Sequence, residues 1–202
     1  GEQIATLLRR TIHAPMQNLL EALNNAPEAE LPAVAQIVGW LLDQAPIEQA
    51  LTQLLGKPTA QKEVLKALVR HGTRVGEFLI EQLESSDMET RQAAISALGR
   101  IGDRRAVFAL TDILKEDNED LLISAAQALT TLGDPNAYEA LLNLLAHPNI
   151  SVRQSAIGAL NALNHPNMAE RTITLLSDTN PLMRESAARI VGYIGYRNSI
   201  EP

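Results

Sequence analysis

The fold of this 202-residue chain is decided by the stretch DMETRQAAISALGRIGD, which spans residues 87–103. Within it, Ala94, Leu98 and Ile101 recur at the three- to four-residue spacing of one helix face. Asp87 offers a side-chain oxygen that can cap the start of a helix. Gly102 tolerates the positive φ at which many helices end. The stretch therefore predicts one amphipathic helix with both ends marked.

The same pattern returns every 31 residues from residue 73 onward without a gap. The aligned apolar columns are Leu83, Leu114, Leu145 and Leu176; Ala94, Ala125, Ala156 and Ala187; Leu98, Leu129, Leu160 and Val191; and Ile101, Leu132, Leu163 and Ile194. Upstream the period shortens by one residue, so that Val38, Leu68 and Leu98 align. An internal period of this length is typical of helical repeat proteins.

The period predicts six units and the beginning of another. The units span residues 14–42, 43–72, 73–102, 103–133, 134–164 and 165–195, and residues 196–202 match the start of a further unit. We expect residues 1–202 to form a single repeat array. We also expect a longer parent protein, because an array that stops inside a unit leaves an apolar face uncovered.

Each unit reads as two helices joined by a polar turn. In the unit 103–133, the first helix is predicted over residues 105–115 and the second ends near Leu132. A polar column precedes the second helices and can cap them; it consists of Asp87, Asn118, Asn149 and Asn180. No segment has the alternating pattern of a strand. The sequence therefore predicts an all-α fold, a right-handed α-solenoid of about six helical hairpins.

Composition narrows the possible functions. The chain is 46% hydrophobic and only 3% aromatic, with a formal net charge of −7 and a pI of about 5.1. An acidic chain disfavours binding to a phosphate backbone, so nucleic acid is an unlikely class of partner. No apolar run is long enough to predict a membrane span. The absence of cysteine excludes disulfides and thiolate metal sites, and it fits a cytoplasmic protein.

The stretch 87–103 resembles the short HEAT repeat of about 30 residues that is often called the phycobilisome-lyase HEAT-like repeat. Residues 149–153 and 180–184 resemble the same signature, whereas Leu122 replaces its arginine in the unit 103–133. The resemblance covers residues 73–202 well and 14–72 weakly. It implies a superhelix whose second helices line a concave surface, where partners of such proteins bind.

This implied arrangement makes the polar positions of the second helices candidates for partner binding. Trp, Tyr and Arg dominate the binding energy of many interfaces, and the candidate columns contain all three. The predicted partner-binding residues are Trp40, Lys66, Arg70, Arg100, Gln127, Thr131, Arg189 and Tyr193. Many acidic residues fall on first helices or turns, which predicts an acidic outer side. In the alternative interpretation, Trp40 and Tyr193 are partly buried packing residues and the cations only solvate the surface.

A second polar column is predicted to be structural. Arg91, Arg153 and Arg184 stand near the start of second helices. Their guanidinium groups can bond to the Asp/Asn column or to turn carbonyls of a neighbouring unit; a ladder for an anionic ligand is the alternative. Together with Asp87, Asn118, Asn149 and Asn180, these arginines make up the predicted structural ladder.

Nothing in the sequence predicts a metal, cofactor or catalytic site. The four histidines are scattered without a cysteine or a second histidine at ligand spacing, and His71 occupies an apolar column that predicts a place in or near the core. No nucleophile elbow, phosphate loop or dinucleotide motif occurs.

We therefore expect a non-catalytic protein-binding scaffold or adaptor domain whose partner is another protein, with no cofactor, metal, membrane or small-molecule ligand. The repeat type leaves open a bilin-lyase-like chaperone of tetrapyrroles or phycobiliproteins. It also leaves open a HEAT-like DNA-alkylation glycosylase, which the low pI disfavours.

Overall fold

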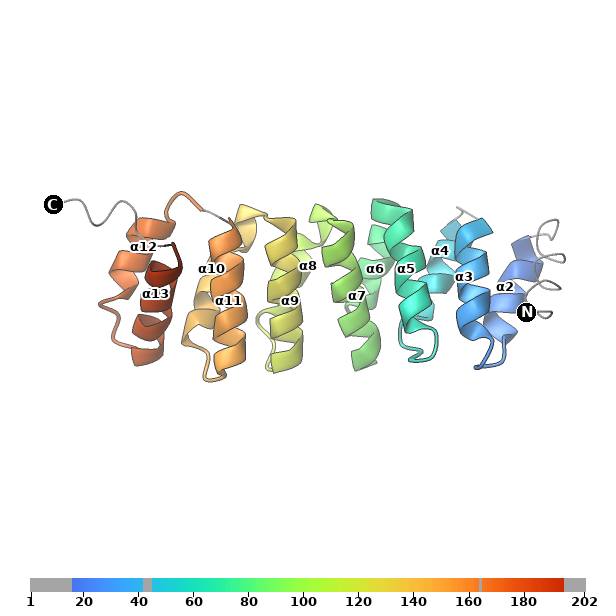
Figure 1. The fold of residues 1–202 in the computed structure, drawn as a ribbon, viewed down its shortest axis with the longest axis horizontal. Coiled ribbons are helices and arrows are strands. Elements are labelled where there is room, and N and C mark those ends of the chain that lie inside the picture. The colour runs from blue at the N-terminus through green and yellow to red at the C-terminus, as the bar shows by residue number, and fades with distance from the viewer. Residues whose placement is uncertain (1–15, 42–44, 164, 195–202) are drawn as a thin grey trace. The chain divides into compact units, whose positions relative to one another are not determined.

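The computed structural model describes residues 16–41, 45–163 and 165–194, and these residues form helices and turns without a strand (Figure 1). The predicted all-α hairpin architecture is confirmed. The chain divides into two compact units, an N-terminal one that ends at Asp103 and a C-terminal one that begins at Arg104. This division coincides with the boundary between the third and fourth periods of the sequence.

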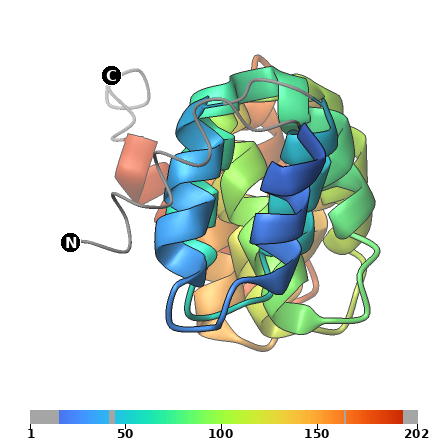
Figure 2. The same cartoon turned by 90° about the vertical axis from the view of Figure 1, so that its right-hand side faces the viewer.

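The N-terminal unit consists of three hairpins arranged in two layers. The hairpins are α2 (Met16–Asn25) with α3 (Leu31–Leu41), α4 (Ala45–Gln53) with α5 (Gln61–His71), and, after the 3₁₀ turn Gly72–Val75, α6 (Gly76–Gln82) with α7 (Met88–Ile101). The second helices α3, α5 and α7 pack side by side, and the first helices α2, α4 and α6 do the same (Figure 1). Figure 2 shows α2 and α3 lying next to each other, one in each layer.

The C-terminal unit repeats this plan, with first helices of six to eight residues. Its hairpins are α8 (Val107–Ile113) with α9 (Glu119–Leu132), α10 (Tyr138–Asn143) with α11 (Ile150–Leu163), and α12 (Met168–Leu175) with α13 (Pro181–Ile194); 3₁₀ turns cover Arg104–Ala106, Pro135–Ala137 and Leu144–Ala146. Helix α11 packs between α9 and α13. The predicted further unit at 196–202 lies outside the described residues.

The helix ends follow the local chemistry of the sequence. Gly72, Gly102 and Gly133 have φ of 65°, 78° and 58°, which a side chain would strain. The first helix predicted over residues 105–115 is shorter, because α8 ends at Ile113. There the amide of Lys115 bonds to the carbonyl of Asp112, a 3₁₀-type closure that tightens the last turn.

The core lies between the layers and includes most members of the predicted columns, whereas Ile101, Leu163 and Val191 are only half-buried. Ala94, Ala125, Ala156 and Ala187 are fully buried, and so are Leu98, Leu129 and Leu160. Leu176 departs from its column, because 39% of its surface is exposed whereas Leu145 is fully buried. Leu145 lies under α13 of the following hairpin, and no hairpin follows α12 and α13 among the residues that the structure describes.

Truncation of one core leucine tests how much its burial contributes to the free energy of unfolding. We expect Leu129→Ala to lower the free energy of unfolding by about 2–5 kcal/mol, because it leaves a cavity that the packed helices cannot close. Urea unfolding followed by circular dichroism measures the change. Thr131→Ala, at an exposed position two residues later, is the control and is expected to change stability by less than about 0.5 kcal/mol. Equal effects of the two substitutions would contradict the assignment of Leu129 to the core.

Candidate functional site

The solvent-exposed side of α3, α5 and α7, away from the first helices, carries the predicted partner-binding residues of the N-terminal unit. We call this surface the second-helix face, and its exposed members are Gln36, Trp40, Lys62, Lys66, Arg70, Ser96 and Arg100. Because the three helices pack side by side, these side chains form one surface across three repeats.

Trp40 and Arg70 form a defined pair on this face. Trp40 is 71% exposed, and the guanidinium carbon of Arg70 lies 5.0 Å from the centroid of its ring. This is the distance of a cation–π interaction. A hydrogen bond of 3.3 Å from Nη1 of Arg70 to the carbonyl of Gly39 holds the guanidinium in place. The ring is therefore open to solvent but fixed in position, and it is not a packing residue.

The close approach of α3 and α5 brings Trp40 and Arg70 together. A Cβ added to Gly39 would lie 2.5 Å from the Cβ of Ala67, which is closer than two non-bonded carbon atoms approach each other. Helices α3 and α5 can therefore pack at this distance only because residue 39 lacks a side chain. Trp40 and Arg70, which extend from the same part of these two helices, come within reach of each other as a result.

The fold itself does not require tryptophan at position 40. The corresponding residues of later units are Arg70, Arg100, Thr131 and Ala162, and all of them are exposed. A position that accepts such different side chains has no packing constraint. The presence of a large exposed aromatic there calls for an explanation outside the stability of the fold.

Charge separates the two layers of the N-terminal unit. Helices α3, α5 and α7 carry five Lys or Arg and two Glu: Lys62, Lys66, Arg70, Arg91, Arg100, Glu63 and Glu89. Helices α2, α4 and α6 carry four Glu and no Lys or Arg: Glu21, Glu48, Glu77 and Glu81. The second helices are thus the positively charged layer of an otherwise acidic chain.

A buried polar cluster ties these helices together. The side chains of Glu48 and His71 are only 3% and 5% exposed, and Nδ1 of His71 lies 3.0 Å from Oε1 of Glu48. Nη2 of Arg74 is 3.3 Å from the same carboxylate oxygen, and Nε2 of His71 is 3.3 Å from the carbonyl of Gly39. The buried place of Glu48 was not predicted, because a single glutamate in a polar stretch gives no periodic signal and its partner lies 23 residues away.

The predicted residues of the C-terminal unit are not brought together in the same way. Gln127 and Thr131 are exposed on α9. Arg189 lies on α13 and donates two hydrogen bonds to Glu185, at 3.2 and 2.9 Å. Helix α11 lies between α9 and α13 and offers only Gly158 and Ala162 at the equivalent exposed positions. The side chain of Tyr193 lies outside the described residues.

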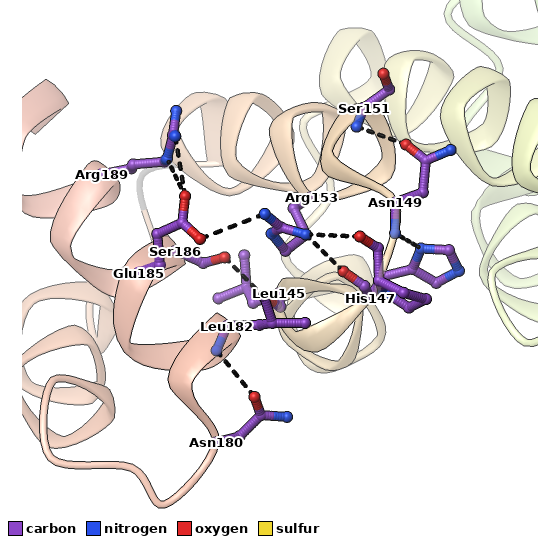
Figure 3. Close-up of polar contacts among 11 residues, drawn as sticks. Leu145, His147, Asn149, Ser151, Arg153, Asn180, Leu182, Glu185, Ser186 and Arg189 are labelled. Atoms are coloured by element: carbon purple, nitrogen blue, oxygen red, sulfur yellow. Dashed lines mark hydrogen bonds and ion pairs between the residues drawn. The ribbon is translucent and has the colours of Figure 1, made fainter.

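Each arginine of the predicted column bonds to the turn that precedes its own helix. Arg153 is buried and donates from Nη1 to the carbonyls of His147 and Pro148, at 2.9 and 3.0 Å (Figure 3). Arg184 donates in the same way to Asp178 and Thr179, and Nε of Arg91 donates to Leu83 at 2.7 Å.

Each of these three arginines thus bonds to its own preceding turn, and Arg153 also contacts a neighbouring unit. Nη2 of Arg153 lies 3.4 Å from Glu185 of the next hairpin (Figure 3). The reason is directional, since side chains in the first turn of a helix point back toward its N-terminus and so reach the preceding turn. Leu122, which replaces the arginine on α9, is buried instead.

The Asp/Asn column caps the second helices. Asp87 and Asn118 each accept a hydrogen bond of 3.0 Å from the amide three residues later. Asn149 and Asn180 accept from the amides of Ser151 and Leu182, at 2.7 and 2.9 Å (Figure 3). The hydroxyl and the amide of Thr90 donate to the Asp87 carboxylate and hold its pKa below the usual value of 3.8.

Phe108 is an exposed aromatic residue that the sequence analysis overlooked. It lies on α8 and is 69% exposed. The equivalent positions of other units hold Glu77, Glu139 and Glu170, all exposed. The replacement of an acidic column member by phenylalanine was the signal that could have identified it.

Among the described residues, no group of three or more His, Asp and Glu side chains is placed to hold a metal ion. His165 stacks instead on the ring of Tyr138, with centroids 4.0 Å apart. No described helix is both long and apolar enough to cross a membrane.

Known proteins resemble this chain through its repeats. The family described as HEAT repeats matches residues 45–130, 76–147 and 138–202. No curated protein matches the chain. An engineered protein solved by the Northeast Structural Genomics Consortium is 20% identical, with a TM-score of 0.54 over 89% of this chain and 96% of that chain. A designed armadillo repeat protein in complex with the peptide (KR)4 is 15% identical, with a TM-score of 0.53 over 89% and 99% of the two chains. At these identities the likeness establishes the fold alone.

The close approach at Gly39 makes a testable prediction. We expect Gly39→Ala to lower the free energy of unfolding by about 1–3 kcal/mol, because the new methyl group forces α3 away from Ala67. Gly158→Ala is the matched control, because a Cβ there meets no atom within 4 Å. It is expected to stabilise the protein by about 0.5–1 kcal/mol through helix propensity. Urea titrations of both variants decide the matter, and a stabilising Gly39→Ala would refute the close approach.

The lowered pKa of Asp87 predicts a pH effect. Because the folded-state pKa lies below the unfolded-state value, the cap stabilises the fold above about pH 4, and this contribution is lost as the pH falls through the folded-state pKa. Asp87→Asn keeps a capping oxygen but cannot titrate. The urea midpoint of the wild type is therefore expected to fall relative to that of Asp87→Asn as the pH is lowered from about 5 through the folded-state pKa of Asp87. A constant difference across this range would show that the carboxylate does not stabilise the folded state.

Proposed function

This chain belongs to the HEAT-repeat family, and from that premise we propose that it is a non-catalytic scaffold that binds a segment of another protein on its second-helix face. The designed armadillo repeat protein of similar fold is bound to a peptide. This supports a peptide segment as the class of ligand.

The exposed Trp40 is the observation that carries the proposal. Its ring is 71% exposed, the repeat does not require it, and Arg70 holds a fixed position over it. Tryptophan and arginine are the residue types most enriched among the energetically dominant residues of protein interfaces. A ring that is already fixed loses little conformational entropy on binding, which favours affinity.

The absence of catalysis is part of the proposal. The titratable cluster of the N-terminal unit, Glu48 with His71, is buried, and its carboxylate and imidazole are bonded within the protein. A general acid or base must reach the proton of a substrate, and these groups do not reach the surface. No observation on the described residues favours the bilin or DNA alternatives.

Capture from a lysate of the source organism tests the proposal. We expect the wild-type chain to retain a protein that a Trp40→Ala/Arg70→Gln/Arg100→Gln variant loses, because that variant removes the aromatic and cationic groups of the second-helix face. Glu77→Gln/Glu81→Gln, on the first-helix layer, is the control and should retain the same protein. Circular dichroism verifies that each bait is folded. If wild type and triple variant capture the same proteins equally, the second-helix face is not the binding surface.

A further inference from the structure

Most of the Lys and Arg side chains of the second-helix face are not paired with a carboxylate of the protein. Lys66 is paired with Glu63 at 2.8 Å. Lys62, Arg70 and Arg100 have no carboxylate within 4 Å among the residues that the structure describes. In the C-terminal unit Lys115, Arg153 and Arg189 are each paired with an acid, and Arg184 bonds to backbone carbonyls. Three such cations therefore lie on one surface of a chain whose net charge is −7.

This arrangement favours an anionic partner. The charged residues of the first helices α2, α4 and α6 are all glutamates. The two layers of the unit therefore attract ligands of opposite charge. A cationic ligand would meet Lys62, Lys66, Arg70 and Arg100 on the second-helix face. A basic peptide such as (KR)4 is therefore disfavoured there, because like charges across an interface oppose binding.

The remaining side chains of the face favour a peptide over a nucleic acid. Glu63 and Glu89 also lie on these helices, and a phosphate backbone needs a more uniformly basic surface. The amide of Gln36 and the hydroxyl of Ser96 are exposed and can bond to the backbone of an extended chain. The ring of Trp40 offers an apolar platform for one side chain of that peptide.

The repeat spacing also suits an extended chain. Trp40, Arg70 and Arg100 occupy the same position of three successive hairpins, 30 residues apart. Neighbouring helices pack at roughly 8–10 Å, and an extended chain rises about 3.3 Å per residue. One repeat therefore corresponds to about two to three residues of peptide. Because the side chains of an extended chain alternate between its two faces, acidic side chains two residues apart can both face Arg70 and Arg100.

From these observations we propose that the second-helix face of the N-terminal unit binds an extended acidic segment of another protein. Carboxylates of the segment pair with Arg70 and Arg100, and a neighbouring side chain packs on Trp40. This inference rests on the proposed function and adds the charge of the partner to it.

Trp40 provides a local reporter, because it is the single tryptophan of the chain. Its emission is followed while the peptides (DE)4, (KR)4 and (GS)4 are added at low salt. We expect (DE)4 to change the emission in a saturable manner, and the affinity to fall as salt is raised, because salt screens exposed charge pairs. The other two peptides are expected to give no saturable change.

A charge-removing variant tests the role of the cations without touching the reporter. Lys62→Gln/Arg100→Gln leaves Trp40 and its contact with Arg70 in place and is expected to bind (DE)4 about tenfold more weakly. Lys115→Gln/Arg171→Gln removes the same charge from outside the face and is expected to bind like the wild type. Because Lys62 and Arg100 are exposed and pair with no carboxylate among the described residues, the first double variant is expected to fold like the wild type, and circular dichroism verifies this.

The inference is overturned if (DE)4 does not change the emission of Trp40, if (KR)4 binds more tightly, or if both double variants bind (DE)4 equally. An oligothymidylate that binds more tightly than (DE)4 would identify a nucleic-acid face instead. These results leave the capture experiment intact, since a protein lost by the Trp40 variant would still support the scaffold with a partner of different charge.

Discussion

The structure depends on the packing of alanine and leucine columns between adjacent second helices. A single hairpin of about 30 residues cannot bury its apolar stripe alone, and each second helix therefore needs a neighbour on either side. The small, fully buried residues Ala125 and Ala156 lie on the packed helices α9 and α11, and Leu98, Leu129 and Leu160 are buried within their own units. Stability is then a sum of contacts between neighbours, and the sequence repeats because each contact repeats.

The same constraint leaves the outward side of the second helices free to vary. The exposed positions of this side hold Trp, Arg, Thr or Ala in successive repeats, and none of these side chains enters the core. The residues that determine function in such a protein are therefore expected at exposed positions, because packing does not constrain them. The charge difference between the two layers of the N-terminal unit is the clearest sign of this.

Polar side chains have a different role at the helix ends. The cap oxygens and the arginines satisfy backbone groups of the turn between first and second helices, where no regular hydrogen bonding is available. Because the groups that Arg91 and Arg184 satisfy belong to their own turn, these bonds stabilise each hairpin locally. Glu48 and His71 join the two helices of one hairpin, α4 and α5, through a buried pair, and His71 also bonds to the carbonyl of Gly39 on α3 of the preceding hairpin.

The sequence by itself determined the helices, their caps, the core columns and the exposed positions, because each depends on residues within one period or on a repeat of that period. It also placed Trp40 and Arg70 on the exposed side of their helices. Tertiary structure alone decided that Arg70 stacks on Trp40, that Gly39 contacts Ala67 and that Glu48 is buried. These features join residues about 20 to 30 positions apart through side-chain directions and helix distances, which a one-dimensional period does not contain.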